Sequence, residues 1–347
     1  MSLAVSHAKA SSIFPLTSLG YAISLFLSTA CSRLVGTKKS IVLSLLVTGV
    51  GVACAPLART LSGLYVFVFL IGMGVGLYLP NAIPLITDSY PERYWGRALS
   101  LHETATAISI FAAPLLALFL LAFTGWRGIL ELFGATCFAC ALVFFAVGHD
   151  VKGARPKGLL SAHLFRHGSI WIIGILWIFA AGSNLGLYFV IPLYFVKELG
   201  MAEGHANAVL GASRLGAVLV AVSVGFAVDR FSLKKIASVL LFASGIATMG
   251  LALPDPSWIK VILFAQAALS AAFFPLSLVT ISRLFGQETR GQATAFIVML
   301  GVVFGVGVIP YLLGLSGDLV SFRFGILLLG CGTAASSFLY GALKGLR

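Results

Sequence analysis

The chain has 347 residues, of which 59% are hydrophobic and only 10% are charged, and its mean hydropathy is +1.05. Soluble proteins carry about 25% charged residues, so this composition excludes a soluble globular domain and indicates a protein that crosses a membrane many times. The formal net charge of +12 lies mainly in short loops between apolar runs, which indicates orientation in a lipid bilayer and not nucleic-acid binding.

The apolar runs have the length of membrane-spanning helices, about 20 residues, and are too long for barrel strands. Residues 1–10 lack the basic segment and cleavage site of a signal peptide. The runs that follow predict eleven spans, at 11–31, 40–57, 64–88, 98–122, 128–148, 169–195, 206–228, 236–253, 258–283, 291–315 and 322–343.

The longest break between spans, at 149–168, is polar and basic and contains Pro and Gly. It predicts a cytoplasmic linker between an N-terminal bundle (1–148) and a C-terminal bundle (169–347). Of the 23 Lys and Arg residues, sixteen fall in one set of alternating loops and six in the other, and Arg214 lies inside a span. Because Lys and Arg accumulate on the cytoplasmic side, this bias predicts a cytoplasmic C-terminus.

Two short motifs recur at nearly one offset. Residues 36–39 (Gly-Thr-Lys-Lys) match residues 232–235 (Ser-Leu-Lys-Lys) at an offset of 196, and residues 95–98 (Trp-Gly-Arg-Ala) match residues 290–293 (Arg-Gly-Gln-Ala) at an offset of 195. Parallel repeats of six helices are a transporter architecture. The counterpart of the span at 169–195 would fall before residue 1, so we expect the first bundle to lack its first helix, as 5 + 6 spans.

The loop before the predicted span at 236–253 carries a specific motif. It contains Gly225, Asp229, Arg230, Lys234 and Lys235. This motif resembles the loop signature of the major facilitator superfamily, which joins the second and third helices of each six-helix half. The resemblance extends through the Gly-rich residues 72–76, the Gly-Arg-Ala at 96–98 and the Gly-Trp-Arg at 125–127. It implies an all-α membrane protein of two pseudo-repeated bundles that transports a solute by alternating access.

The sequence also departs from that family. The first-half loop, from Cys31 to Gly36, lacks the family's Asp, and Val68 or Leu70 stands where an Arg often precedes the Gly-x-Gly motif. That Arg is often linked to proton coupling, so its absence puts coupling by that route in doubt. The Gly-Pro-x-x-Gly motif of many drug antiporters is reduced to Ala-Pro-Leu-Leu-Ala at 113–117.

A charged residue deep in a membrane span is a candidate for function, because its burial in lipid is costly. Arg214 lies three residues from the centre of the span at 206–228 and roughly 20 Å along the helix from Asp229. An unpaired guanidinium at this depth fits an anionic substrate, such as a carboxylate; the alternatives are a structural Arg bonded to carbonyls of a broken helix, or one that snorkels outward. The other predicted substrate-binding residues are Asn184, Tyr188, Gln266 and Tyr311.

Further polar residues are assigned to gating or to proton transfer. His102 and Glu103 could relay a proton or form a charge cluster with Arg93 or Arg97, and Asp88 could pair with Arg33 or Lys38. The predicted gating set, by its likeness to the family's gating cluster, is Asp88, Arg33, Gly225, Asp229, Arg230, Lys234 and Arg290.

No enzyme signature, cofactor motif or metal site is predicted: the chain has no P-loop, and His163 and His167 lack a third ligand. The five cysteines lie in or beside apolar runs and predict no disulfides. We therefore predict a monomeric secondary transporter in a bacterial inner membrane. Its predicted cargo is a small solute, with an organic anion as the candidate, and its candidate coupling partner is a proton or another ion. The alternatives are a drug or metabolite efflux antiporter and a truncated remnant that does not transport.

Overall fold

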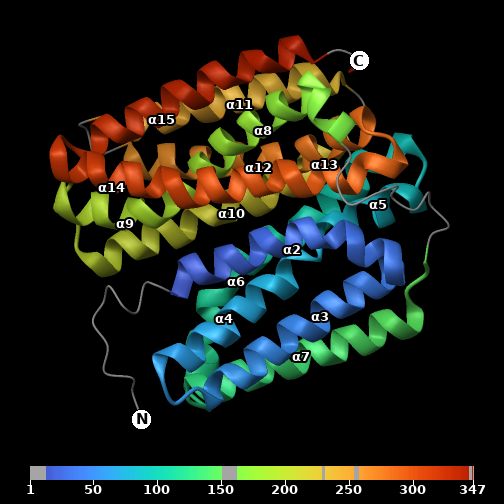
Figure 1. Ribbon diagram of the computed structural model, residues 1–347. Helices are drawn as coiled ribbons and strands as arrows, with labels where there is room; N and C mark the ends of the chain where they lie inside the picture. Colours follow the sequence, from blue (N-terminus) through green and yellow to red (C-terminus); the bar gives the residue numbers. More distant parts are fainter. Residues whose placement is uncertain (1–12, 151–161, 229–230, 254–257, 344–345, 347) are drawn as a thin grey trace. The chain divides into compact units, whose positions relative to one another are not determined.

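A computed structural model describes residues 13–150, 162–228, 231–253, 258–343 and 346. Within these ranges all regular secondary structure is helical (Figure 1), which confirms the predicted all-α class. The longer helices are α2 (Ile13–Val35), α3 (Thr37–Cys54), α4 (Leu61–Gly76), α5 (Leu79–Ser89), α6 (Trp95–Leu121), α7 (Trp126–Val147), α8 (Gly168–Ala181), α9 (Leu187–Lys197), α10 (Glu203–Val228), α11 (Leu233–Gly250), α12 (Ile259–Leu284), α13 (Gln287–Leu300), α14 (Ile309–Leu319) and α15 (Phe322–Ser336).

Shorter helical segments connect or extend these helices. Two are π-helical and continuous with their neighbours: η4 joins α8 to α9, and η5 joins α13 to α14. The short segments are η1 (Ala55–Leu57), η2 (Glu92–Tyr94), η3 (Ala162–Arg166), η4 (Gly182–Gly186), η5 (Gly301–Val308) and η6 (Ser337–Ala342). In the described residues, 9 helical segments are long and apolar enough to cross a membrane. Helices α6 and α10 have 27 and 26 residues, so they are as long as the helices in these nine segments.

The number of eleven spans stays a prediction, and the span predicted at 64–88 is interrupted in the structure. The run at 64–88 forms two helices, α4 and α5, separated by Leu77 and Tyr78. Pro80 lies in the first turn of α5, where its missing N–H would have no helical partner in any case. The Asn81 side chain donates a hydrogen bond of 2.7 Å to the Leu77 carbonyl, which stabilises the break.

The chain divides into two compact units that do not follow sequence order. Unit 1 contains residues 1–89, 114–164 and 285–299, and unit 2 contains residues 90–113, 165–284 and 300–347. Each unit therefore includes one segment from the other half of the sequence. The division at 149–168 stays a prediction. Nearly all of α13 belongs to unit 1, where its Gln287 and Arg290 side chains bond to Asp88 at the end of α5.

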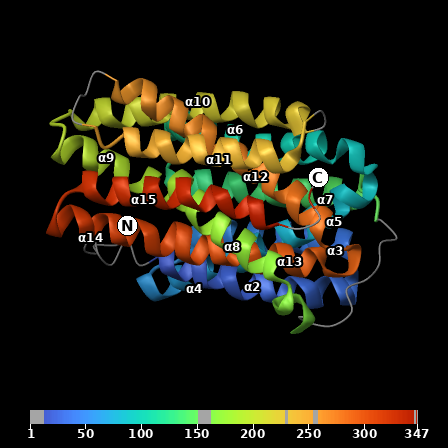
Figure 2. The ribbon, with the colours of Figure 1, turned by 90° about the horizontal axis from the view of Figure 1, so that it is seen from above.

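Three helix pairs of unit 1 recur in unit 2. In unit 1, α2 packs against α4, and α3 packs against α4 and α7 (Figure 1). In unit 2, α10 packs against α12, and α11 packs against α12 and α15. Figure 2 shows α15 between α11 and α14, both of which it contacts. The repeat found in the sequence, at an offset of 195 or 196 residues, is therefore also a repeat of helix packing.

Close packing of the helices depends on glycine at several crossings. In unit 1, a Cβ atom at Gly74 would overlap the side chain and backbone of Thr48 on α3. The Ser44 hydroxyl also donates a hydrogen bond of 2.8 Å to the Gly74 carbonyl. Helices in lipid associate mainly through such close van der Waals contact and interhelical hydrogen bonds.

Candidate functional site

The Arg214 side chain is buried in unit 2, with a residue exposure of 5%. Its Nη1 and Nη2 donate hydrogen bonds to the Asn184 side-chain oxygen (3.3 Å) and the Asn184 backbone carbonyl (3.0 Å). Its guanidinium carbon lies 4.0 Å from the centre of the Tyr188 ring, in cation–π contact. The structure therefore brings together three of the five residues predicted to bind substrate.

No carboxylate in the described parts of the chain forms an ion pair with Arg214. Its Nε is buried and has no hydrogen-bond partner among the described residues. The hydrogen bonds from Nη1 and Nη2 both go to Asn184, which is a neutral amide residue. The guanidinium thus keeps its positive charge uncompensated by a formal negative charge in this part of the structure.

The π-helical segment η4 provides the Arg214 acceptors. A π-helix shifts the backbone hydrogen-bond pattern and often occurs at functional sites. Here the Asn184 carbonyl, inside this segment, accepts from Arg214, while the Asn184 Nδ2 donates to the Ser270 hydroxyl of α12 at 2.9 Å. Arg214 bonded to a carbonyl of an irregular helix is also the structural role considered from the sequence. The observed hydrogen bonds of Arg214 are therefore compatible with a structural role and with a role in substrate binding.

Gln266, also predicted to bind substrate, bonds to the same segment from another side. Its Nε2 donates to the Ser183 carbonyl at 2.8 Å and to the Thr248 hydroxyl at 3.2 Å. The Ser183 hydroxyl in turn lies 2.6 Å from the Thr333 hydroxyl of α15. These bonds tie η4 to α11, α12 and α15, so Gln266 has a clear structural role whether or not it contacts a ligand.

Tyr311 lies apart from this network in its contacts. It is on α14, its residue exposure is 69%, and no contact between it and Arg214 is present in the described part of the chain. Ser183, Ser270 and Thr333 were not selected from the sequence. Their only signal is a hydroxyl within an apolar span, which many helix-packing residues share.

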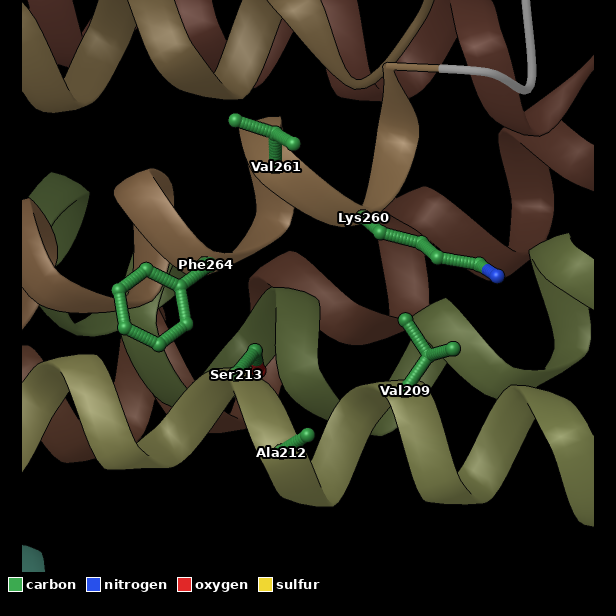
Figure 3. A pocket seen from close by; sticks show the side chains of 6 residues that line it. All are labelled: Val209, Ala212, Ser213, Lys260, Val261 and Phe264. Atoms are coloured by element: carbon green, nitrogen blue, oxygen red, sulfur yellow. The ribbon is translucent and has the colours of Figure 1, made fainter.

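A cavity of about 350 Å³ lies between α10 and α12 in unit 2 (Figure 3). It is lined by Val209, Ala212, Ser213, Lys260, Val261 and Phe264. Figure 3 shows the Lys260 side chain extended toward Val209, with the Phe264 ring at the opposite end. The cavity is thus mainly apolar and carries one cationic side chain. Arg214 follows Ser213 in the chain but does not line the cavity.

Arg290 and Asp88 form a buried ion pair within unit 1. Arg290 Nη1 lies 3.0 Å from Asp88 Oδ1, and the side-chain exposures are 5% and 10%. The same Nη1 donates to the Thr87 hydroxyl at 2.5 Å, and Gln287 Nε2 donates to Asp88 at 3.2 Å. These bonds connect α13 to α5 across 202 residues of sequence. We call Thr87, Asp88, Gln287 and Arg290 the α5–α13 lock.

The other residues predicted for gating have separate environments. Arg33 is exposed at the end of α2. Lys234 donates from Nζ to the Gly341 carbonyl at 2.7 Å and to the Leu343 carbonyl at 3.3 Å, at the C-terminal end of η6. Gly225 lies in α10. Asp229 and Arg230 fall outside the described residues.

Two further polar pairs lie on or near α6 and α12. His102 Nδ1 lies 3.2 Å from Glu103 Oε1, so the two predicted relay residues form a close pair on α6. Arg283 forms an ion pair with Glu92 at 3.2 Å. No group of three His, Cys, Asp or Glu residues that could hold a metal ion is found in the part of the chain that the structure describes.

The sequence is similar to those of several named transporters. It is 24% identical over 203 residues to the putative niacin/nicotinamide transporter NiaP of Bacillus subtilis, a match that covers 56% of this chain and 51% of that protein. It is 23% identical over 330 residues to the 4-hydroxybenzoate transporter PcaK of Acinetobacter baylyi, covering 80% of this chain and 71% of that protein. The chain thus spans about half the length of the first of these relatives.

The structure is also similar to that of the fucose:proton symporter FucP of E. coli, with a TM-score of 0.83 and 16% identity. That match covers 97% of this chain and 91% of the symporter. Because the two sequences are only 16% identical, the match establishes a shared fold and nothing about the substrate. The sequence profile described as Major Facilitator Superfamily matches residues 2–259 and 187–344. The protein is therefore a multi-pass membrane protein that belongs to the Major Facilitator Superfamily.

Proposed function

We propose that the protein is a secondary transporter that moves a small organic anion across the membrane by alternating access, and that Arg214 is the anion anchor. The observation that carries this proposal is the buried guanidinium of Arg214, which has no carboxylate partner among the described residues. A charge inside a membrane span is costly, and a substrate carboxylate would supply the missing negative charge.

The chemistry around Arg214 favours a carboxylate that is attached to a flat ring. A guanidinium has five N–H donors, and those bonded to Asn184 leave the Nε hydrogen without a partner. The Tyr188 ring beside the guanidinium offers an aromatic surface, and aromatic rings favour stacked or edge-to-face neighbours. One relative is named as a putative niacin/nicotinamide transporter and another as a 4-hydroxybenzoate transporter. Niacin and 4-hydroxybenzoate are small aromatic carboxylates, which supports the same substrate class, whereas nicotinamide is the neutral amide.

The experiment measures binding and counterflow with chosen probes in proteoliposomes. The anions are nicotinate and 4-hydroxybenzoate, the neutral analogue is nicotinamide, and the cation is tetraphenylphosphonium. Arg214→Gln removes the charge, Arg214→Lys keeps it, and Arg283→Gln is the matched control because Arg283 is paired with Glu92. A hydrogen bond to a charged group contributes about 1.5–3 kcal/mol, so Arg214→Gln should weaken anion binding by about 10- to 150-fold.

A second variant separates anchoring from a purely structural role. Asn184→Ala removes the side-chain acceptor of Arg214 and keeps the charge, so anion binding should persist with a modest change in affinity. Equal losses in Asn184→Ala and Arg214→Gln, with both proteins folded by size-exclusion chromatography, would show that Arg214 only braces η4. Anion binding that survives Arg214→Gln, or a preference for the cation, would refute the anchor and favour an exporter of lipophilic cations.

The coupling ion and the orientation are secondary parts of the proposal. The His102–Glu103 pair is a candidate for proton coupling because an imidazole and a carboxylate in contact can pass a proton between them. The bias of basic residues supports a cytoplasmic C-terminus in a bacterial inner membrane. Uptake that is insensitive to a proton gradient in Glu103→Gln and in the unmodified chain alike would exclude the relay.

A further inference from the structure

A cleft in unit 2 separates the first halves of α10 and α12, which meet near the middle of α10. They come into contact at Gly216, where a Cβ atom would lie 3.0 Å from the Phe264 ring. Nearer the start of both helices, the cavity of about 350 Å³ lies between Val209 on α10 and Lys260 on α12 (Figure 3). The cleft is therefore closed at its inner end and open at the end that carries Lys260.

The residues at the helix contact explain why these two helices stay apart. In unit 1 the equivalent helices α2 and α4 touch through their backbones, since a Cβ atom at Gly72 would overlap the Thr17 carbonyl. The counterpart of Gly72 at the offset of 195 is Ala267, and a methyl group holds two helix backbones further apart than a hydrogen does. In unit 2 Gly216 accordingly faces the Phe264 ring and not a backbone carbonyl.

The walls of the cleft offer an apolar surface with one charge at its open end. Val261 and Phe264 are 59% and 41% exposed. The Ser213 hydroxyl donates to the Leu210 carbonyl of its own helix at 2.6 Å, so it is already satisfied. The Lys260 ammonium forms no ion pair with any residue that the structure describes. A ligand that fits this cleft is therefore apolar along its length and anionic at one end.

The open end of the cleft matches the level of the lipid headgroups. Helix α12 begins at Ile259 and is apolar enough to cross a membrane. Trp258 precedes it and is 63% exposed, as is typical of an aromatic side chain at the membrane–water interface. Lys260 lies in the first turn, where its flexible stem can reach the headgroups. From Val209 to Gly216 the cleft follows α10 for about 10 Å, which is within one half of a hydrocarbon core of about 30 Å.

We propose that the α10–α12 cleft binds one anionic phospholipid, with the phosphate at the Lys260 ammonium and an acyl chain along Val261 and Phe264. The contact at Gly216 ends the path of the chain. A zwitterionic headgroup carries its own cation, so Lys260 favours phosphatidylglycerol over phosphatidylcholine. This site is independent of the proposed anion anchor, because Arg214 does not line the cavity.

The test uses the full chain in phosphatidylcholine nanodiscs that contain a trace of a photoactivatable lipid. One probe is phosphatidylglycerol with a diazirine in an acyl chain, and the other is phosphatidylcholine with the same chain. Illumination links the probe to the nearest residues, which mass spectrometry then identifies. Contact with bulk lipid is measured on α7 at Leu142, which is 69% exposed and lies outside the cleft.

The expected result is a preference for phosphatidylglycerol at the cleft alone. One lysine near an anionic lipid changes the affinity about fivefold, so the phosphatidylglycerol probe should label α10 and α12 at the cleft about five times more than the phosphatidylcholine probe. Unlabelled phosphatidylglycerol should compete with this labelling and saturate it. At Leu142 the two probes should label equally.

Four variants separate the charge from the shape of the cleft. Lys260→Gln should remove the preference for phosphatidylglycerol, and Lys260→Arg should keep it. Lys197→Gln is the matched control, because Lys197 is exposed at the end of α9 and does not line the cleft; the preference should be unchanged. Ala212→Phe fills the cleft with a ring and should remove the labelling there by both probes, although Lys260 is still present.

Four results would overturn the proposal. Equal labelling of the cleft by both probes would mean that it holds bulk lipid without selection. A preference that survives Lys260→Gln would place the headgroup elsewhere. Displacement of the probe by oleate and not by phosphatidylglycerol would identify a free fatty acid as the ligand. Labelling of α7 without labelling of the cleft, in a chain that circular dichroism shows to be folded, would mean that no lipid enters it.

Discussion

The α5–α13 lock predicts a strong energetic coupling between residues that are 202 positions apart in the chain. Asp88→Asn removes the negative charge that faces Arg290 at 3.0 Å, in a site where the side chains are only 5% and 10% exposed. Leaving a buried charge without its partner costs about 3–5 kcal/mol. Because Asn keeps one oxygen that can accept from Gln287 or Arg290, we expect the lower value, about 3 kcal/mol.

The reverse variant completes a double-mutant cycle. Arg290→Gln should cost about 2–3 kcal/mol, because it leaves Asp88 with the Gln287 amide but without a cation. The double variant should cost about 3 kcal/mol and not the sum of the single changes, because neither buried charge remains. The coupling energy is then about 2–3 kcal/mol, within the range of residues that share a buried network.

The assay is thermal unfolding in detergent, followed by circular dichroism. At about 2 °C per kcal/mol for a chain of this size, Asp88→Asn should lower the Tm by about 6 °C. The difference should persist at high salt, because a buried pair is screened much less than a surface pair. Effects of the two changes that add within about 0.5 kcal/mol would refute the buried ion pair as the interaction that holds α13 against α5.

Three further predictions concern other parts of the molecule. Gly74→Val should destabilise the chain by about 1–3 kcal/mol through overlap with Thr48, whereas Gly125→Ala, in open space, should be neutral in the same thermal assay. Gln266→Leu should cost about 1 kcal/mol, because it removes the amide that bonds a backbone carbonyl of η4; an unchanged Tm would contradict this. Lys260→Gln should weaken anion uptake less than fivefold and only at low salt, because the ammonium is exposed; a loss that salt does not reduce would place Lys260 in direct contact with the substrate.

The membrane class and the family follow from local properties of the sequence. Long apolar runs, short basic loops and repeated motifs are written in consecutive residues, and they were enough to predict an all-α protein of the major facilitator superfamily, which the fold and the family match confirm. The same reasoning singled out Arg214, since one charge inside an apolar span stands out without any structural information. Its role as an anchor stays a prediction.

Other features depend on contacts that no local pattern records. The sequence favoured Arg33 or Lys38 as a partner of Asp88, but the structure pairs Asp88 with Arg290 on a helix from the other half of the chain. The exchange of segments between the units follows from such contacts, which hydropathy does not encode. The π-helical segment at Asn184 was likewise hidden, because a shift in backbone hydrogen bonding leaves no mark on composition.

The sequence by itself determined that the chain is built of long apolar helices and that Arg214 lies inside one of them, because transfer from water to lipid depends on each segment's own composition. Only the tertiary structure decided how the polar groups inside these helices are satisfied. A buried guanidinium can bond to a carboxylate, an amide or a backbone carbonyl, and the choice depends on which helices pack together. In this protein, helix packing places the Asp88 carboxylate beside Arg290 and the neutral Asn184 beside Arg214. This difference in partners distinguishes the α5–α13 lock from the candidate substrate site.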